Sequence, residues 1–374
     1  ALHSLALRHG LSPRDPHVAT SLLHAYASSG LLGSARRMFD EMRERTVVTW
    51  NALISCFARR EWLRQEEGLF LFGEMVCCSP CDGVRPNVDT FIEALSCCAR
   101  LGVLDHGRSV HVLALRWLDG FVSAELGTAL VHMYCKCGSL GSGKKVFEMM
   151  ENKDVSTWTA MIGGLAMHGC GEEAVGMFER MVEENLTPDS QVFTSVLHAC
   201  SHSGLVEKGI KIFNDMKEEY KVNARMEHYG AMVDLFGRAG RLEEAEEMVK
   251  SMPYPPNRVV WGSLLHACLV NGEVEFGKRL ERQLLESELG LEEEGDGSGF
   301  YVGVSNVYAK NGRWDEVRRV RSRMMENGVR KESGFSLVEV NGSVHKFSVG
   351  GARHSLTGTL LSLLCGINKE MAYA

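Results

Sequence analysis

The chain has 374 residues, of which 45% are hydrophobic and 24% are charged. This composition excludes collagen-like, mucin-like and wholly disordered chains, and no run of about 18 apolar residues predicts a membrane-spanning helix. The formal net charge of -7 excludes a uniformly basic surface for nonspecific binding to nucleic acid, but not a local basic groove.

Two features bear on the cellular compartment. The 12 cysteines are scattered through apolar stretches, a pattern that favours free thiols in a reducing compartment over a disulfide scaffold. The chain opens with Ala1, in a stretch typical of the middle of a helix. We therefore expect the true N-terminus and any targeting segment to lie outside this sequence.

An internal repeat organises the chain. Trp50, Trp158 and Trp261 stand in similar surroundings and are separated by 108 and 103 residues. Other landmarks agree, since Gly102 and Gly204 are 102 residues apart. A period of this size divides into three units of about 34 residues, the length of a helical hairpin repeat.

Each unit follows the same pattern. A first stretch has apolar residues at three-four spacing, as at 128–134, and is followed by a turn that contains glycine. These turn glycines are Gly30, Gly102, Gly138, Gly169, Gly204 and Gly240. A second stretch ends in Phe-x-x-Met, whose spacing places both side chains on one helix face and predicts core packing. The motif occurs at Phe39/Met42, Phe72/Met75, Phe147/Met150, Phe178/Met181 and Phe213/Met216.

The prolines support the same division into units. All eight are predicted to lie between units, including Pro80, within six extra residues near 77–82 that we interpret as a loop insertion. A proline inside a helix would cost about 3 kcal/mol. No alternating strand pattern precedes residue 330. The predicted fold is all-α, an α-solenoid of stacked antiparallel helix pairs in which each unit needs its neighbours to bury its apolar face.

The motifs separate two helical repeats that share this period. Tetratricopeptide repeats, which bind peptides, have Trp-x-x-Leu-Gly-x-x-Tyr, whereas Trp50 here is followed by Asn-Ala-Leu-Ile. The stretches at 47–54, 129–138 and 195–204 resemble instead the pentatricopeptide repeat family of plant organelles. The units alternate between roughly 31, 35 and 36 residues, which resembles the P-L-S arrangement of the editing-factor branch of that family.

The resemblance assigns units in chain order. After an L-type tail that ends near Asp15, the units span 16–46 (S), 47–87 (P), 88–123 (L), 124–154 (S), 155–189 (P), 190–225 (L) and 226–257 (S). The resemblance implies three regions: a repeat array at 1–257, a C-terminal E region at 258–350 and a divergent tail at 351–374.

The E region is predicted to contain two degenerate repeats and a hairpin. The degenerate repeats would span 258–290 and 298–335. After them, alternating runs at Phe335–Val340 and 344–349 flank Asn341-Gly342. Asparagine followed by glycine between alternating runs is the strongest short signal for a β-hairpin.

Members of the resembled family recognise single-stranded RNA one base per unit, through the fifth and last residues of the unit. We call these two residues a reading pair. Carried onto this sequence, the pairs are Thr20/Thr46, Asn51/Asn87, Thr128/Asp154, Thr159/Asp189 and Gly230/Asn257, while the L-type units have Ile92 and Thr194 in fifth place. In the family, threonine with aspartate is linked to guanine and asparagine with asparagine to a pyrimidine. The implied target is purine, pyrimidine, any, G, G, any, any, from 5′ to 3′.

A structural explanation competes with this role. Asp154 and Asp189 also fall where helix N-caps occur, and capping alone would explain an aspartate there. Asn51, beside Trp50, could form a local backbone bond. The recurrence of small polar residues at matched offsets favours the reading role.

The sequence contains no motif for catalysis. Cytidine deaminase chemistry needs His-x-Glu and Pro-Cys-x-x-Cys. The sequence has no His-x-Glu, and its only Cys-x-x-Cys, Cys78 with Cys81, lacks a second half. No nucleophile elbow or phosphate-binding loop is present. We expect no catalytic residue, metal site, cofactor, small-molecule substrate or membrane association.

The resemblance implies a sequence-specific adaptor on single-stranded organellar RNA that specifies C-to-U editing sites. A separate DYW-type cytidine deaminase and other editing factors would act in trans, in a mitochondrion or plastid, with the mitochondrion slightly favoured. Two alternatives stay open: an RNA processing or stabilisation factor, and a protein-binding scaffold. Eight basic and three acidic residues between Lys310 and Lys331 form either a phosphate or partner contact or a solvated helix face.

Overall fold

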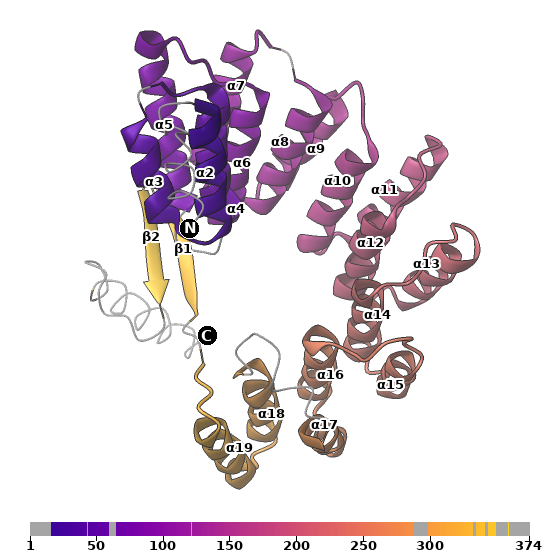
Figure 1. Cartoon of the computed structure of the whole chain (residues 1–374). Helices are drawn as coiled ribbons and strands as arrows, with labels where there is room; N and C mark the ends of the chain where they lie inside the picture. Colours follow the sequence, from indigo (N-terminus) through magenta and orange to yellow (C-terminus); the bar gives the residue numbers. More distant parts are fainter. Residues whose placement is uncertain are drawn as a thin grey trace.

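The computed structural model describes residues 16–42, 44–59, 65–120, 122–286, 298–331, 334–340 and 343–348, together with residue 358. Within these residues the chain forms 18 helices and a single two-stranded sheet. Figure 1 shows the helices stacked along an arc. The predicted all-α solenoid with a C-terminal hairpin is confirmed. The L-type tail before residue 16 and the divergent tail, apart from residue 358, lie outside the described residues.

Consecutive helices pack as antiparallel pairs, one pair for each predicted unit. The pairs are α2 (Pro16–Ser28) with α3 (Leu32–Glu41), α4 (Val47–Arg59) with α5 (Gln65–Asp82), α6 (Val88–Leu101) with α7 (Leu104–Trp117), α8 (Ala124–Lys136) with α9 (Leu140–Met149), α10 (Val155–Met167) with α11 (Gly171–Glu183), α12 (Ser190–Ser203) with α13 (Val206–Glu218), α14 (Met226–Arg238) with α15 (Leu242–Lys250), α16 (Arg258–Asn271) with α17 (Val274–Glu286), and α18 (Ser298–Lys310) with α19 (Trp314–Glu326). The first helix of each pair begins at the residue where its unit was predicted to begin.

Glycine ends the first helix of most pairs for a conformational reason. Gly204 follows α12 with φ 69°, in the left-handed region that only glycine adopts without strain, and its N–H donates to the carbonyl of Cys200. Gly138 after α8 has φ 82°. The turn into the second helix therefore depends on a residue without a side chain.

Neighbouring units are joined through their first helices, which pack on one another from α2 to α18. From α10 to α18 these even-numbered helices lie on the inner side of the arc (Figure 1). At five junctions, the phenylalanine of one unit's Phe-x-x-Met contacts an aromatic ring in fourth place of the next first helix. The ring centroids of Phe39 and Trp50 are 4.7 Å apart, and those of Phe147 and Trp158 are 4.9 Å apart, both edge to face. The predicted core role of Phe-x-x-Met is confirmed, since every member is buried.

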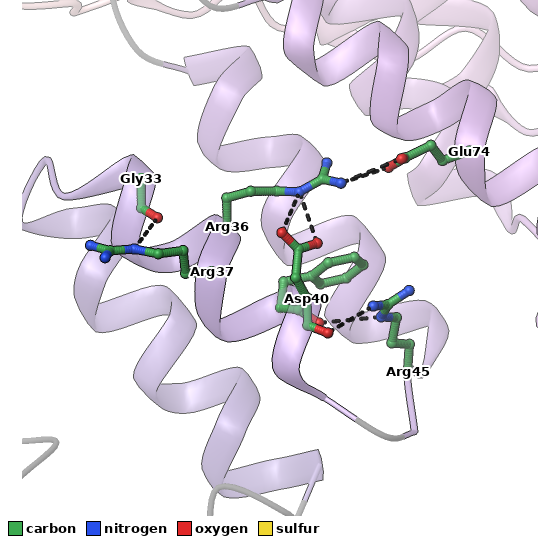
Figure 2. A network of polar contacts seen from close by, with 7 residues as sticks. Gly33, Arg36, Arg37, Asp40, Arg45 and Glu74 are labelled. Carbon is green, nitrogen blue, oxygen red and sulfur yellow. Dashed lines mark hydrogen bonds and ion pairs between the residues drawn. The ribbon is translucent and has the colours of Figure 1, made fainter.

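The second helices are joined by ion pairs between their exposed faces. Arg36 of α3 lies 3.0 Å from Asp40 on its own helix and 3.1 Å from Glu74 of α5, as Figure 2 shows. Comparable pairs between second helices are Lys144–Glu173, Arg180–Glu148, Lys208–Glu172, Arg241–Glu207, Arg279–Glu246 and Arg313–Glu275. Exposed pairs contribute about 0–1 kcal/mol each, so the buried contacts between aromatic rings dominate the junctions.

The extra residues near 77–82 form helix, so the predicted loop insertion and the placement of Pro80 between units are wrong. Helix α5 has 18 residues and includes Pro80. A proline so near the helix end removes one backbone bond and leaves the following turn intact. Gly83 closes that turn by donating to the carbonyl of Ser79 at 3.1 Å.

The hairpin consists of β1 (Phe335–Val340) and β2 (Ser343–Ser348), which pair antiparallel. Their connection, Asn341-Gly342, lies outside the described residues. The hairpin contacts the N-terminal part of the arc at the third helix pair, where the carboxylate of Glu339 accepts from the backbone N–H of Asp105 at 3.0 Å, at the start of α7. Figure 1 shows the strands beside the N-terminal helices.

Candidate nucleic-acid interface

Four of the predicted last residues cap a helix, as the competing explanation requires. Asn87, Asp154, Asp189 and Asn257 are the N-caps of α6, α10, α12 and α16. Oδ1 of Asp154 accepts from the backbone N–H of Thr157 at 2.8 Å, and Oδ1 of Asp189 accepts from that of Val192 at 3.0 Å. Capping occupies one oxygen of each aspartate. The other oxygen, Oδ2, has no hydrogen-bond partner among the residues that the structure describes.

Two complete pairs line one groove with a volume of about 590 Å³. Thr128 and Asp154 lie beside Thr159 and Asp189, and Ile92 of the preceding unit also lines the groove. The remaining lining residues are Ser96, Glu125, Ala129, His132, Ser156, Ala160 and Gln191. Residues that are far apart in sequence thus meet across the first helices of successive units. The threonines are half-buried and the aspartates exposed, so the polar atoms are reachable from solvent.

Asn51 and Asn87 form a connected pair one unit before Ile92. The side-chain amide of Asn51 donates from Nδ2 to Oδ1 of Asn87 at 2.9 Å. The hydroxyl of Thr90 donates to Oδ1 of Asn51 at 2.7 Å. The competing explanation for Asn51, a local backbone bond, is therefore not what the structure contains.

A third residue, which the sequence did not single out, connects the members of three pairs. It occupies the third place of the following unit and is a fully buried threonine at Thr49, Thr90 and Thr157. The hydroxyl of Thr49 lies 3.2 Å from that of Thr20 and 2.9 Å from that of Thr46. Each connection joins two units through side chains about 30 to 40 positions apart, a spacing that only stacking of the units brings together.

The other fifth-place threonines bond within their own helix. Thr159 donates to the carbonyl of Val155 at 2.7 Å, and Thr194 donates to the carbonyl of Ser190 at 2.9 Å. Behind Thr159, the third place of the next unit is Val192, which has no hydroxyl to offer. Thr159 and Asp189 therefore share a groove without the connecting hydroxyl.

The Gly230/Asn257 pair has no side-chain connection. A Cβ added at Gly230 would meet nothing nearer than Val260 at 3.9 Å, so the fifth place is open. Oδ1 of Asn257 accepts from the backbone N–H groups of Val259 and Val260 at 3.0 and 3.1 Å. Of this pair, only Asn257 contributes a side chain, and that side chain caps α16.

The groove is acidic, which limits what it can bind. Asp154 and Asp189 are joined there by Glu125, whose pKa is lowered by hydrogen bonds from its own backbone N–H and from the hydroxyl of Ser123. Carboxylates repel phosphate and accept hydrogen bonds without donating any. The groove therefore suits neutral groups with N–H donors, such as base edges, and phosphates must lie elsewhere.

The basic stretch after residue 310 is largely engaged within the protein. Lys310 donates to the carbonyls of Leu269 and Val270, at the end of α16. Arg321 donates to the hydroxyl of Ser305 at 2.8 Å. Arg319 lies 2.9 Å from Glu281, a buried carboxylate that also accepts from the hydroxyl of Tyr308.

The described part of the chain contains neither a metal-holding cluster nor a membrane-spanning helix. Among its residues, no group of three or more histidine, cysteine or acidic side chains is placed to hold a metal ion. None of its helices combines the length and the apolarity needed to cross a membrane. Burial raises the pKa of the Cys97 and Cys137 thiols to about 12, which leaves both as unreactive thiols at neutral pH.

Family models match most of the solenoid. The PPR repeat model matches residues 18–47, 48–79, 128–155, 191–220 and 227–254, and the PPR repeat family model matches 153–202. The E motif model matches residues 272–339, from the turn before α17 into β1.

Similar proteins carry the same repeats. One pentatricopeptide repeat-containing protein of Arabidopsis thaliana, named chloroplastic/mitochondrial, is 41% identical over 376 residues, which cover 99% of this chain and 58% of that protein. A second from Arabidopsis thaliana is also 41% identical, over 90% of this chain and 70% of that protein. The first three relatives are matched over 58%, 52% and 59% of their own lengths, so the chain spans little more than half of each.

Solved structures agree on the fold. The crystal structure of the pentatricopeptide repeat protein PPR10 in complex with an 18-nucleotide RNA element is similar with a TM-score of 0.53. That match covers 83% of this chain and 50% of the other at 19% identity, which supports the shared fold alone. Together, the repeat matches, the E motif match and the identity to curated relatives show that this chain belongs to the pentatricopeptide repeat family.

Proposed function

We propose that the chain is a sequence-specific single-stranded RNA-binding adaptor that specifies sites of C-to-U editing in organellar RNA. The observation that carries the proposal is the groove in which two predicted reading pairs lie side by side, Thr128/Asp154 and Thr159/Asp189. One unit earlier, Asn51 and Asn87 form a third pair with joined side chains. The RNA-bound PPR10 structure, which shares the fold, supports a nucleic-acid ligand.

The chemistry of the groove favours guanine at two adjacent positions. Asp154 and Asp189 each keep one oxygen outside the helix cap, and a carboxylate only accepts hydrogen bonds. Guanine is the base whose Watson–Crick edge has two adjacent N–H donors, on N1 and N2. Single-stranded RNA exposes these edges to side chains. We therefore assign G, G to the fourth and fifth letters of the target purine, pyrimidine, any, G, G, any, any.

The E motif match at 272–339 supports the editing role. In this proposal residues 1–257 recognise RNA, residues 258–350 recruit a separate DYW-type deaminase with other editing factors, and residues 351–374 are a divergent tail. The chain contributes recognition and no catalytic residue. Relatives named chloroplastic or mitochondrial support an organellar location, for which we keep the mitochondrion as the first choice.

One amino-acid substitution tests which base is assigned to which unit. Thr159→Asn should shift the preference at the fifth letter from G to U, because asparagine in first place favours a pyrimidine, while the fourth letter stays G. Dissociation constants for RNAs that differ at one letter measure this. Glu207→Gln, at an exposed ion pair between second helices, is the control and should change no preference. An unchanged fifth letter in Thr159→Asn would contradict the assignment.

A plant line that lacks the protein tests the biological role. The proposal predicts that one or a few cytidines in organellar transcripts lose editing while the transcript ends stay in place. Loss of a transcript end with editing intact would replace the proposal with an RNA processing or stabilisation role. Tight binding to a protein and none to RNA would replace it with a scaffold role.

A further inference from the structure

Two reading pairs of identical chemistry differ in the residue behind them. Thr128/Asp154 is followed in the third place of the next unit by Thr157, and Thr159/Asp189 is followed by Val192. Both of these third residues are fully buried. The two pairs in the groove can therefore be compared directly, because only Thr128/Asp154 contacts a buried hydroxyl.

The proton directions around Thr157 follow from its partners. The Asp154 carboxylate only accepts, so the hydroxyl of Thr157 donates its single proton to Oδ1 of Asp154, at 2.8 Å. The hydroxyl of Thr128 lies 2.7 Å from that of Thr157. Since the proton of Thr157 is already committed, Thr128 must be the donor in that contact. Thr128 is left with only lone pairs to offer to the groove.

Thr159 is held less firmly. Its hydroxyl donates to the carbonyl of Val155, which in a helix already accepts the backbone N–H four residues on. That bond is a second, shared one, and Val192 offers no alternative acceptor. The hydroxyl of Thr159 can therefore turn and donate to a ligand, or stay in place and accept from it.

A buried hydroxyl also connects the two side chains of the Asn51/Asn87 pair. The hydroxyl of Thr90 has two acceptors within reach, Oδ1 of Asn51 at 2.7 Å and Oδ1 of Asn87 at 2.9 Å, and Nδ2 of Asn51 donates to the latter at 2.9 Å. Thr90 thus contacts both members of its pair, as Thr157 contacts both Thr128 and Asp154. At the Thr128/Asp154 pair these contacts set the hydrogen-bond direction, and Thr157 does not itself line the groove.

We propose that the third residue of the following unit is a positioning residue, which sets the hydrogen-bond polarity of the reading pair and so the strictness of base choice. This inference rests on the proposed RNA-binding function. A pair that only accepts matches the N1–H of guanine and leaves the N1 acceptor of adenine unpaired. A pair with a hydroxyl free to turn can donate to adenine N1, so it prefers guanine over adenine less strongly. Thr128/Asp154 should therefore reject adenine more strongly than Thr159/Asp189.

The test exchanges the two third residues in the full chain. Wild type, Thr157→Val, Val192→Thr and the double exchange are compared on four RNAs that carry G or A at the fourth and fifth letters. In the wild type, the G-over-A ratio of dissociation constants should be roughly fivefold larger at the fourth letter than at the fifth, the effect of one hydrogen bond. Thr157→Val should lower the ratio at the fourth letter alone, and Val192→Thr should raise it at the fifth letter alone.

Both side chains already occur at the third place of a unit, since Thr157 and Val192 are each fully buried. We therefore expect the fold to accept the exchange. If Thr157→Val lowers Tm too far to be measured, Val192→Thr decides alone, since its new hydroxyl can donate to the cap oxygen of Asp189. Base ratios that follow the third residue while Tm stays within a few degrees support the inference. Guanine preference at both letters with ratios that neither variant moves would overturn it and leave the proposed function standing. No RNA binding by the wild type would overturn both.

Discussion

Asp154 has two roles that a single substitution can separate. One oxygen caps α10 and the other is available to a ligand. Asparagine caps a helix about as well as aspartate does, but its side chain also donates. Position 154 therefore allows the structural explanation and the recognition explanation to be tested against each other.

Asp154→Asn should leave stability nearly unchanged and remove the preference for guanine at the fourth letter. Asp154→Ala should remove the guanine preference and also lower the free energy of unfolding, by about 0.5–2 kcal/mol for the missing cap. Urea unfolding and RNA titration of the same preparations measure the two effects. If Asp154→Asn kept full guanine preference, the aspartate would be a cap and nothing more.

His228 occupies the third place of the unit at 226–257, where three other units have threonine. It is fully buried, Nδ1 accepts from the N–H of Arg225 at 3.0 Å, and Nε2 donates to the carbonyl of Ser190 at 2.9 Å. The contact at Nδ1 requires the neutral ring, because both nitrogens of a protonated ring are donors. Burial lowers the pKa of His228, and the hydrogen bond to Ser190 offsets this only in part.

The depressed pKa makes stability depend on pH. The unfolded chain has a histidine pKa of about 6.5, so the contribution of neutral His228 is complete above that pH and is lost as the pH falls below it. His228→Gln, which can still accept and donate, should reduce the fall in unfolding free energy between pH 7.5 and pH 5.5. An equal fall in wild type and variant would show that other groups cause it.

At the scale of the element, the sequence predicted what depends on local pattern. The first helices begin where predicted, because capping residues and turn glycines such as Asp154 and Gly204 are local signals. The helix at 77–82 was missed because Pro80 is a breaker that a helix end tolerates. Thr157 was missed because its role depends on Thr128, 29 positions earlier, and that contact exists only after the units stack.

Helix α3 allows the two kinds of junction contact to be compared within one element. Phe39→Ala removes a fully buried ring that packs on Trp50 and should cost about 3–5 kcal/mol. Arg36→Gln breaks the pair with Glu74 and should cost at most about 1 kcal/mol, less at high salt. Denaturant unfolding of both variants measures the costs. Equal costs would mean that the outer ion pairs matter as much as the aromatic junctions.

At the scale of the whole molecule, the hairpin joins the C-terminal end of the arc to its N-terminal part, at the third helix pair. The Glu339 side chain accepts from the N–H groups of Asp105 and His106 and pairs with the His106 ring, while Leu337 and Val344 pack on the N-terminal core. The sequence predicted the hairpin but not this contact, because no local pattern encodes a pairing of residues 234 positions apart.

Removing Glu339 should open the arc. Burial alone would raise the pKa of Glu339, but the hydrogen bonds from Asp105 and His106 lower it below its ordinary value. The contact is therefore complete above a pH of about 4.3 and is lost as the pH falls below it. Glu339→Ala should increase the radius of gyration in X-ray scattering at pH 7, whereas Glu207→Gln should not. Identical radii would show that the hairpin contact does not hold the ends together.

The most direct test of the account is the selection of bound sequences from a random pool of single-stranded RNA, at physiological salt, with the chain of 374 residues. We predict enrichment of purine, pyrimidine, any, G, G in that order from 5′ to 3′, with the guanine at the fourth letter more strongly fixed than the guanine at the fifth. Featureless binding, or enrichment of a motif without the adjacent guanines, would contradict the assignment of the groove at Thr128/Asp154 and Thr159/Asp189.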